Sequence, residues 1–254
     1  MKRFGISLLF SLFIVSPILA YELAEVKDSG SIKGHVRFSG PVPVDEVIKI
    51  DRDTEVCGNE QKAGRFIISS NGGVKNAVVW IEGIERGKAF SSPNVEIMIK
   101  DCRIVPLVSI GFVGGNFVLR NEDPLLHTIQ LKLSLEYHKA LSQRPLEDGA
   151  TIYNIALPRK GTRVEKPIKK YHAYSKETGY IQVKSNAHPW LRGYIFVFDH
   201  PYGTVTDDNG SFMIDNIPPG EYTIMVWHEA FGLKEKKITI KEGRVEDVEF
   251  DLSK

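Results

Sequence analysis

The stretch "TVTDDNGSFMIDNIPPGEYTIMVWH", residues 204–228, decides the fold. It contains two tight-turn signals, Asp208-Asn209-Gly210 and Pro218-Pro219-Gly220, and a run rich in β-branched and aromatic residues follows each of them. Asn and Gly tolerate the positive φ angles of tight turns, and the residues from Tyr222 to Val226 alternate their sides as those of a strand do. The stretch therefore predicts short strands joined by tight turns.

The rest of the chain has the same character. Runs such as "SIKGHVRF", "VEIMIK", "GYIFVFD" and "KKITIKEG" are short, rich in β-forming residues and bounded by Gly, Pro, Asn or Asp. Only "LSLEYHKALSQ", residues 133–143, has the four-residue apolar spacing of a helix. Many short strands with turn signals between them predict an all-β protein made of one sandwich or two.

The first twenty residues predict export. "MKRFGISLLFSLFIVSPILA" places Lys2 and Arg3 before an apolar run that ends at the small residue Ala20, as a secretory signal peptide does. The rival interpretation is an uncleaved anchor, but the run is short for a bilayer span of about 20 residues. We expect a periplasmic or secreted protein with no transmembrane segment after removal of residues 1–20.

Charge argues against one class of partner. The formal charge of +1 becomes −1 without Lys2 and Arg3, so we expect no binding of nucleic acid. The most basic segment, "LPRKGTRVEKPIKKY" at residues 157–171, contains one acid, Glu165. Two interpretations stay open, a solvated loop and a docking patch for an acidic protein. The basic residues of this patch are Arg159, Lys160, Arg163, Lys166, Lys169 and Lys170.

The two cysteines, Cys57 and Cys102, predict one disulfide. Export favours disulfides, and the stretch around Cys57, "EVCGNEQ", offers no second metal ligand at a usual spacing. A pair of metal ligands is the rival interpretation. In the loop-entropy model, a bridge over this separation stabilises the chain by about 4 kcal/mol.

Motifs of common enzymes are absent from the sequence. It contains no Gly-x-Ser-x-Gly, no Gly-rich phosphate loop and no His-Glu-x-x-His, and it has no Cys-x-x-Cys-His for a c-type haem. We therefore expect no catalytic residues and no enzymatic activity.

The C-terminal part resembles the carboxypeptidase regulatory-like domain, a small transthyretin-like β-sandwich. The family has the pattern "TD-x-x-G-x-F", which is matched here by Thr206-Asp207, Gly210 and Phe212. Its second pattern, "PPG-x-Y-T", is matched by residues 218–220 and 222–223. The family's first strands also occur, but far upstream. They are formed by Gly30, Ile32, Gly34 and Val36, and by Ala77, Val79 and Ile81. We therefore expect a discontinuous regulatory-like domain of residues 29–92 and 200–254, with a second domain at 93–199, although a tandem arrangement stays open.

The segment 93–199 resembles a cupredoxin. In that family one metal-binding histidine follows "N-x-D", and a Cys, a second His and a Met come from a loop before the last strand. His127 after Asn121-Glu122-Asp123 fits the first, and His188 in "SNAHPWL" fits the second. The chain also resembles a group of bacterial exported proteins that join such a domain to a regulatory-like module and share "DHPY", "WHE" and "HPW"; they are labelled plastocyanin-like or methylamine-utilisation proteins. The resemblance implies a Greek-key sandwich inserted in or adjoining the regulatory-like one.

The metal ligands of that group are incomplete in this chain. The loop usually reads Cys-x-x-His-Pro-Trp-Met, and Ser185 and Leu191 stand at the Cys and Met positions. Gln130 and Leu107 occupy two further positions where the group has histidines. A blue-copper site needs a soft thiolate with two imidazoles, and neither Ser nor Leu replaces it. The resemblance therefore implies a degenerate type 1 site, with no cofactor or with weakly held copper.

Two functions stay open on the sequence. The first is an exported, non-enzymatic binding or scaffolding component of a cell-envelope or extracellular assembly, acting through an unidentified protein partner. The second is a copper-binding, plastocyanin-like electron or copper carrier that uses His127 and His188. Four residues of the regulatory-like part are candidates for the seam between the two domains: His200, Trp227, His228 and Glu229.

Overall fold

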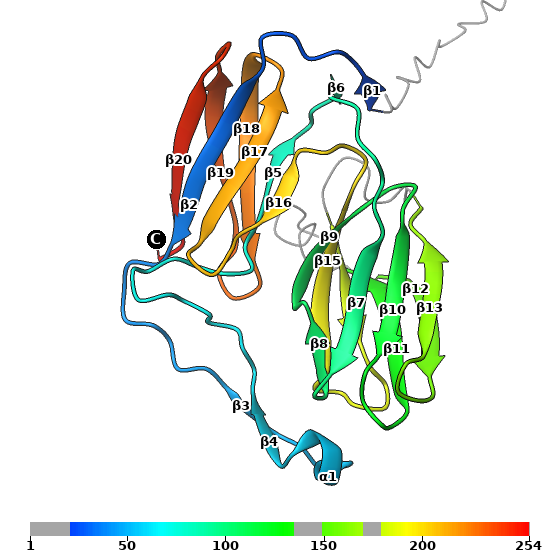
Figure 1. Cartoon of the computed structure of the whole chain (residues 1–254). Coiled ribbons are helices and arrows are strands. Elements are labelled where there is room, and N and C mark those ends of the chain that lie inside the picture. Colours follow the sequence, from blue (N-terminus) through cyan, green and yellow to red (C-terminus); the bar gives the residue numbers. More distant parts are fainter. Residues whose placement is uncertain (1–20, 135–148, 170–178, 254) are drawn as a thin grey trace, which may run out of the picture.

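The computed structural model describes residues 21–134, 149–169 and 179–253 and is built almost entirely of strands (Figure 1). In these ranges the one helix is the single turn α1 (Thr54–Cys57), which confirms the predicted all-β class. No helix of the described part is long and apolar enough to cross a membrane. The expected signal peptide lies outside the described residues, as does most of the expected helix at 133–143.

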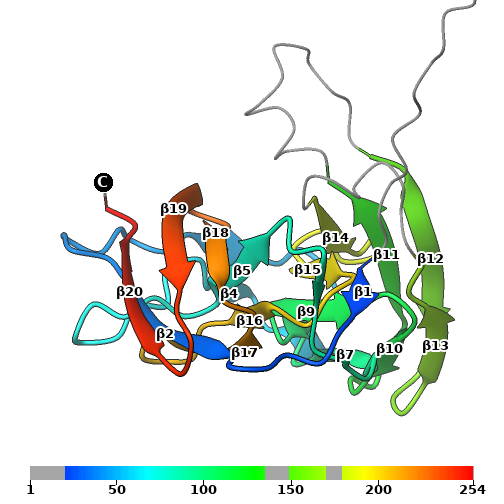
Figure 2. The same cartoon turned by 90° about the horizontal axis from the view of Figure 1, so that it is seen from above.

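Four sheets follow one another across the molecule as stacked layers (Figure 2). Sheet 1 has the order β17 (Ser211–Ile217), β2 (Gly30–Arg37), β20 (Val245–Asp251). Sheet 2 has the order β16 (Gly203–Val205), β5 (Val78–Glu82), β18 (Gly220–His228), β19 (Gly232–Ile240). Sheet 3 has the order β12 (Thr151–Leu157), β11 (His127–Leu133), β14 (Tyr180–Lys184), β15 (Arg192–Phe198), β9 (Val108–Phe112). Sheet 4 has the order β13 (Arg163–Pro167), β10 (Asn116–Asn121), β7 (Val95–Lys100), β8 (Arg103–Val105).

Sheets 1 and 2 form the first sandwich. Strand β2 runs antiparallel to β17 and parallel to β20, and β5 lies between β16 and β18. Residues before position 83 and after position 202 therefore share both sheets. The alternation of β2 explains its place, because Ile32 and Val36 are fully buried in the core while Lys33 and His35 are exposed. That 29–92 and 200–254 fold as one unit independently of 93–199 stays a prediction.

Sheets 3 and 4 form the second sandwich. Its core joins Ile129 and Leu131 of β11 to Ile97 of β7 and Leu119 of β10, all nearly inaccessible to solvent. Sheet 3 is mixed, because β11, β14 and β15 pair antiparallel while β15 and β9 pair parallel. Strand β11 starts at His127, and the loop 185–191 that carries His188 joins β14 to β15 at the same end.

The two sandwiches meet through a third apolar core between sheets 2 and 3. Trp80, Met225 and Trp227 of sheet 2 pack with Phe196 and Phe198 of sheet 3. Strand β5 accordingly is buried on both faces. Val79 and Ile81 face the first core, and Val78 and Trp80 face this seam. A seam of buried aromatic residues makes the two sandwiches one packed body.

Residues 41–67, called the strap below, leave the first sandwich after β2 and reach the end of the second (Figure 1). The strap contains a two-stranded ladder of β3 (Val47–Lys49) and β4 (Glu60–Lys62), with α1 between them. The predicted disulfide Cys57–Cys102 is confirmed, with Cα atoms 5.3 Å apart, and it ties the strap to the turn between β7 and β8. A second small ladder pairs β1 (Glu22–Leu23) with β6 (Arg86–Gly87).

Candidate metal centre

The "N-x-D" segment builds one side of the site. The Asn121 side chain donates hydrogen bonds to the carbonyls of Leu125 and Leu157, and its own oxygen accepts the N–H of Asp123. These bonds fix the loop that leads into β11. They bring the Asp123 carboxylate to 2.9 Å from Nε2 of His127. The motif therefore has a structural reason, since Asn121 shapes the loop and Asp123 orients the imidazole.

The loop 185–191 builds the other side. The Ser185 hydroxyl accepts the backbone N–H of His188 and lies 3.1 Å from the hydroxyl of Thr128. Thr128 in turn accepts the N–H groups of residues 186 and 187. This small polar frame turns the His188 ring inward, and its Nδ1 lies 2.9 Å from Nδ1 of His127. The two predicted histidines thus meet, and both are almost completely buried.

A third group, from the strap, was missed by the sequence analysis. Oδ2 of Asp53 lies 2.8 Å from Nε2 of His188, across 135 residues of sequence. Asp53 precedes α1 with a φ of 52°, and its side chain makes no capping bond to the helix. The carboxylate that would ordinarily cap this turn is used for His188 instead. Asp53 lies four residues before Cys57. The expected disulfide between Cys57 and Cys102 could therefore have indicated that Asp53 lies near Cys102.

Asp123 also holds the turn that carries Cys102. Its carboxylate accepts the backbone N–H groups of Asp101 and Cys102 at 2.8 and 2.9 Å. These two residues form the tight turn between β7 and β8, both with positive φ, 52° and 51°. Left-handed backbone costs about 1–2 kcal/mol for each residue that is not glycine. The two charge-assisted hydrogen bonds offset that cost and fix Cys102 beside the histidines.

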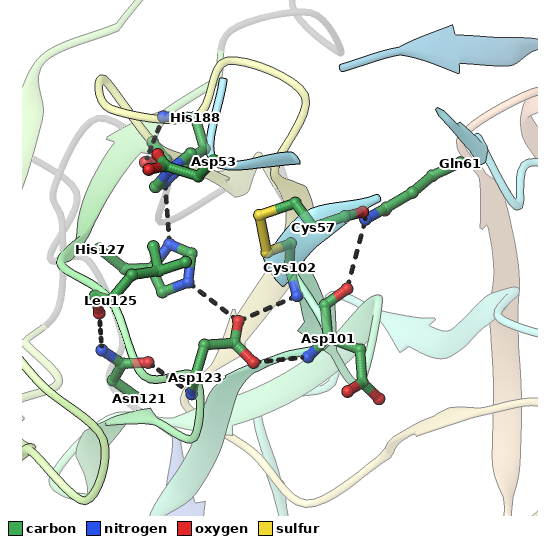
Figure 3. Close-up of a disulfide and its surroundings, with 11 residues drawn as sticks. Asp53, Cys57, Gln61, Asp101, Cys102, Asn121, Asp123, Leu125, His127 and His188 are labelled. Atoms are coloured by element: carbon green, nitrogen blue, oxygen red, sulfur yellow. Dashed lines mark hydrogen bonds and ion pairs between the residues drawn. A yellow bond between two sulfur atoms is a disulfide. The ribbon is translucent and has the colours of Figure 1, made fainter. Parts of the chain in front are cut away.

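Together these contacts form one chain, Asp53–His188–His127–Asp123, which is buried except at Asp53 (Figure 3). Its three side-chain contacts need three hydrogen atoms, whereas two neutral imidazoles carry only two. If both Nε2–H groups donate to the carboxylates, two Nδ1 lone pairs face each other at 2.9 Å. One additional positive charge, a proton or a metal ion, therefore completes the chain.

The surroundings disfavour the proton on His127. Burial lowers the pKa of His127 below its usual value, and the hydrogen bond to Asp123 only partly opposes this effect. The two carboxylates of the chain favour a cation between the rings. The geometry can thus hold one positive ion at the two Nδ1 atoms.

Comparison with known families agrees with the C-terminal motifs. Residues 194–253 match the family model of the carboxypeptidase regulatory-like domain. The chain carries a carboxypeptidase regulatory-like domain. No curated protein matches the chain significantly.

Solved structures similar to this chain include copper proteins. A reduced Cu(I) amicyanin variant is 15% identical, covers 43% of this chain and 85% of its own, and has a TM-score of 0.27. A purple cupredoxin from Nitrosopumilus maritimus is 20% identical over 41% of this chain and 99% of its own, with a TM-score of 0.27. The copper-containing nitrite reductase of Thermus scotoductus SA-01 is 17% identical over 45% of this chain, which spans only 24% of that enzyme, with a TM-score of 0.29. Scores of this size do not establish a shared fold, and the second sandwich is defined by its own strand order.

The residues present do not fit a type 1 copper site. Ser185 stands at the thiolate position, and its hydroxyl is engaged by His188 and Thr128. Leu191 is buried in the core of the second sandwich. Gln130 donates to the Thr151 hydroxyl. The Cys102 sulfur is bonded to Cys57 and supplies no thiolate. The two imidazoles do fit a cation without a soft ligand, because each Nε2 meets a carboxylate in the way that metal-bound histidines usually do.

Two of the four seam candidates lie at the seam beside the regulatory-like domain. Trp227 belongs to the seam core. The side chain of Glu229 is buried and accepts hydrogen bonds from Arg192 and from the Tyr194 hydroxyl, both on β15. Arg192 also donates to the carbonyl of Ala63 in the strap. Glu229 and Arg192 therefore tie the regulatory-like domain, the second sandwich and the strap together.

The other two candidates make local hydrogen bonds. Nδ1 of His200 accepts the N–H of Tyr202, and Nδ1 of His228 accepts the N–H of Ala230. Burial lowers the pKa of both imidazoles to about 4. These two bonds stay within the loops of the two residues, and His228 in addition hydrogen-bonds the backbone of Lys75.

The basic patch lies around β13, an edge strand of sheet 4. Arg159, Lys160 and Lys169 are exposed, Arg163 pairs with Glu165, and Lys166 lies 5.9 Å from the centre of the Tyr153 ring. Lys170 falls outside the described residues. Charged side chains on an edge strand also discourage unwanted strand pairing, and a docking role for the patch stays a prediction.

Proposed function

We propose that this is an exported, non-enzymatic protein that holds one copper or zinc ion between His127 and His188 and does not act as a blue-copper electron carrier. The observation that carries this proposal is the facing pair of Nδ1 atoms, 2.9 Å apart, with a carboxylate on each Nε2. Metal–nitrogen bonds measure about 2.0–2.1 Å, so one ion can contact both atoms.

The chemistry of such a site is binding rather than electron transfer. Imidazole nitrogens suit Cu(II) and Zn(II), and the absent thiolate is the ligand that tunes blue-copper sites. Strap residue Asp53 covers the Nε2 side of His188, whose side chain is 2% exposed. Asp53 and Asp123 fix the ring orientations and increase the basicity of the two ligands.

The test is metal binding to the purified oxidised protein. Titration calorimetry with Cu(II) and Zn(II) should give one site per chain, with no intense visible thiolate band in the copper form. His127→Ala and His188→Ala should each abolish this site, because one imidazole alone cannot hold the ion. His35→Ala, which removes an exposed histidine of β2, is the matched control and should bind as the unaltered protein does.

A second function is favoured by the surface of the strap. Val42, Val44 and Val47 are 52%, 94% and 48% exposed, which is unusual for three neighbouring aliphatic residues and suits a protein partner. In that case the chain Asp53–His188–His127–Asp123 would be a polar core closed by a proton, and the protein would act as a binding or scaffolding component. A folded protein that takes up no metal in the titration above supports this function over the first.

A further inference from the structure

A second set of ligating groups surrounds the disulfide. The Cys102 sulfur, a carboxylate oxygen of Asp123 and a ring nitrogen of His127 lie within 4.8 Å of one another, and all three residues are buried. Figure 3 shows the three side chains converging beside the sulfur–sulfur bond. The set differs from the histidine pair, because it uses the face of His127 that points to Asp123 and does not include His188.

We propose that reduction of Cys57–Cys102 creates a zinc site formed by the Cys102 thiolate, Asp123 and Nε2 of His127. A disulfide sulfur is a poor ligand, whereas a thiolate is a strong one. One sulfur, one imidazole and one carboxylate are all ligands that Zn²⁺ accepts, and three protein ligands leave a fourth position open. The inference goes beyond the proposed function and does not depend on metal binding at the two Nδ1 atoms.

The reduction requires a dithiol as co-reactant. A thiolate of the dithiol attacks the Cys57 sulfur, the bond between the cysteines breaks, and its electron pair leaves on Cys102 as a thiolate. The second thiol of the reductant then displaces Cys57, so the dithiol becomes a disulfide and two electrons pass to the protein sulfurs. The Cys57 thiolate takes up a proton, and the Cys102 thiolate stays available for the metal.

Cys57 is the sulfur on the outer side. Residues 51–56 and 58–60 of the strap are exposed, so the bond lies beneath a single layer of chain. Cys102 is fully buried in the turn that Asp123 holds. Attack at Cys57 therefore needs a smaller opening than attack at Cys102, and it leaves the buried sulfur as the thiolate.

Hydrogen bonding is complete once this site is filled. With Nε2 of His127 and the Asp123 carboxylate on the metal, Nδ1–H of His127 donates to Nδ1 of His188. Nε2–H of His188 then donates to Asp53. The two neutral imidazoles carry two N–H groups, which are enough for these two contacts. Without the metal there are three contacts, and two N–H groups cannot satisfy them all.

The test compares Cys57→Ser with Cys102→Ser. Both variants lose the same disulfide, and they differ only in which sulfur remains. Co²⁺, a spectroscopic substitute for Zn²⁺, should give a thiolate charge-transfer band with Cys57→Ser and none with Cys102→Ser. Adding Asp123→Asn to Cys57→Ser should weaken Zn²⁺ binding by at least about 10-fold, because even outer-shell changes cost 10–100-fold. A thiolate charge-transfer band of equal intensity in the two single variants would overturn the inference.

Reduced, unaltered protein provides a second measurement if Cys57→Ser does not fold. After reduction, and removal of the dithiol under nitrogen, Zn²⁺ should slow alkylation of Cys102 and leave that of Cys57 unchanged. Protection of both thiols, or of neither, would contradict the site. His188→Ala distinguishes this site from the histidine pair, since it should abolish binding to the oxidised protein and leave the Co²⁺ band of the Cys57→Ser chain in place.

Discussion

Two pairs of buried histidines show what separates a site from a packed core. Each Nε2 of His127 and His188 meets a carboxylate, and their Nδ1 atoms face each other. His200 and His228 lie against the rings of Phe198 and Phe231, and each accepts a backbone N–H from its own loop. Burial is common to all four. The carboxylate partners and the close approach of two Nδ1 atoms are found only in the first pair, and these features make it a candidate for binding a cation.

The largest expected effect comes from removing the inner carboxylate. Asp123→Ala should lower the free energy of unfolding by about 4 kcal/mol, within the 3–5 kcal/mol typical for breaking a buried charged partnership. The reason is that the N–H groups of Asp101 and Cys102 and the His127 ring all lose their acceptor. Urea unfolding at neutral pH measures the loss. Asp208→Ala, which removes an exposed carboxylate, is the control, and an equal loss in both would show that Asp123 is not the centre of the network.

The next effect concerns the second pair of histidines. The pKa of His200 falls from about 6.5 in the unfolded chain to about 4 when folded, so the folded state prefers the neutral ring. Its contribution is therefore complete above pH 6.5 and is lost as the pH falls toward 4, which amounts to about 3 kcal/mol. His200→Asn should lower stability at neutral pH and remove that part of the acid dependence. An unchanged slope between pH 6.5 and 4 would contradict a neutral, buried His200.

The smallest effect on stability is expected at the outer carboxylate. Asp53 is 43% exposed, so Asp53→Asn should change the free energy of unfolding by less than about 1 kcal/mol. The same change should weaken metal binding at the histidine pair by about 10–100-fold, because it removes the negative charge of the group that orients His188. Asp51→Asn, two residues away and exposed, is the matched control and should alter neither quantity. Unchanged affinity in Asp53→Asn would mean that Asp53 serves only the strap.

The strands and the meeting of the two histidines could be predicted from the sequence. Gly210 adopts the positive φ, 73°, that its turn signal required, and strand β18 contains the alternating run from Tyr222. The approach of His188 to His127 followed from the cupredoxin resemblance of their motifs. The disulfide followed from export and the count of two cysteines.

The carboxylate partner of His188 and the seam could not be predicted from local patterns. Asp53 reaches His188 across 135 residues, and no periodicity records such a contact. The continuous apolar run from Val78 to Ile81 does indicate a strand buried on both faces. The run does not reveal that the second face of the strand meets Phe196 and Phe198 of another sandwich, because that contact depends on how two complete sheets pack.

The order of strands in sheets 1 and 2 has a consequence for how the chain is made. Strands β2 and β5 are synthesised early, but the partners that flank them in their sheets, β16, β17, β18 and β20, all lie beyond residue 202. Both strands must therefore wait with open edges until nearly the whole polypeptide has emerged, and such long-range pairing is slow and prone to aggregation. A nascent chain that stalls before residue 203 therefore leaves β2 and β5 without any of the strands that flank them in their sheets, and the apolar faces of both strands stay uncovered.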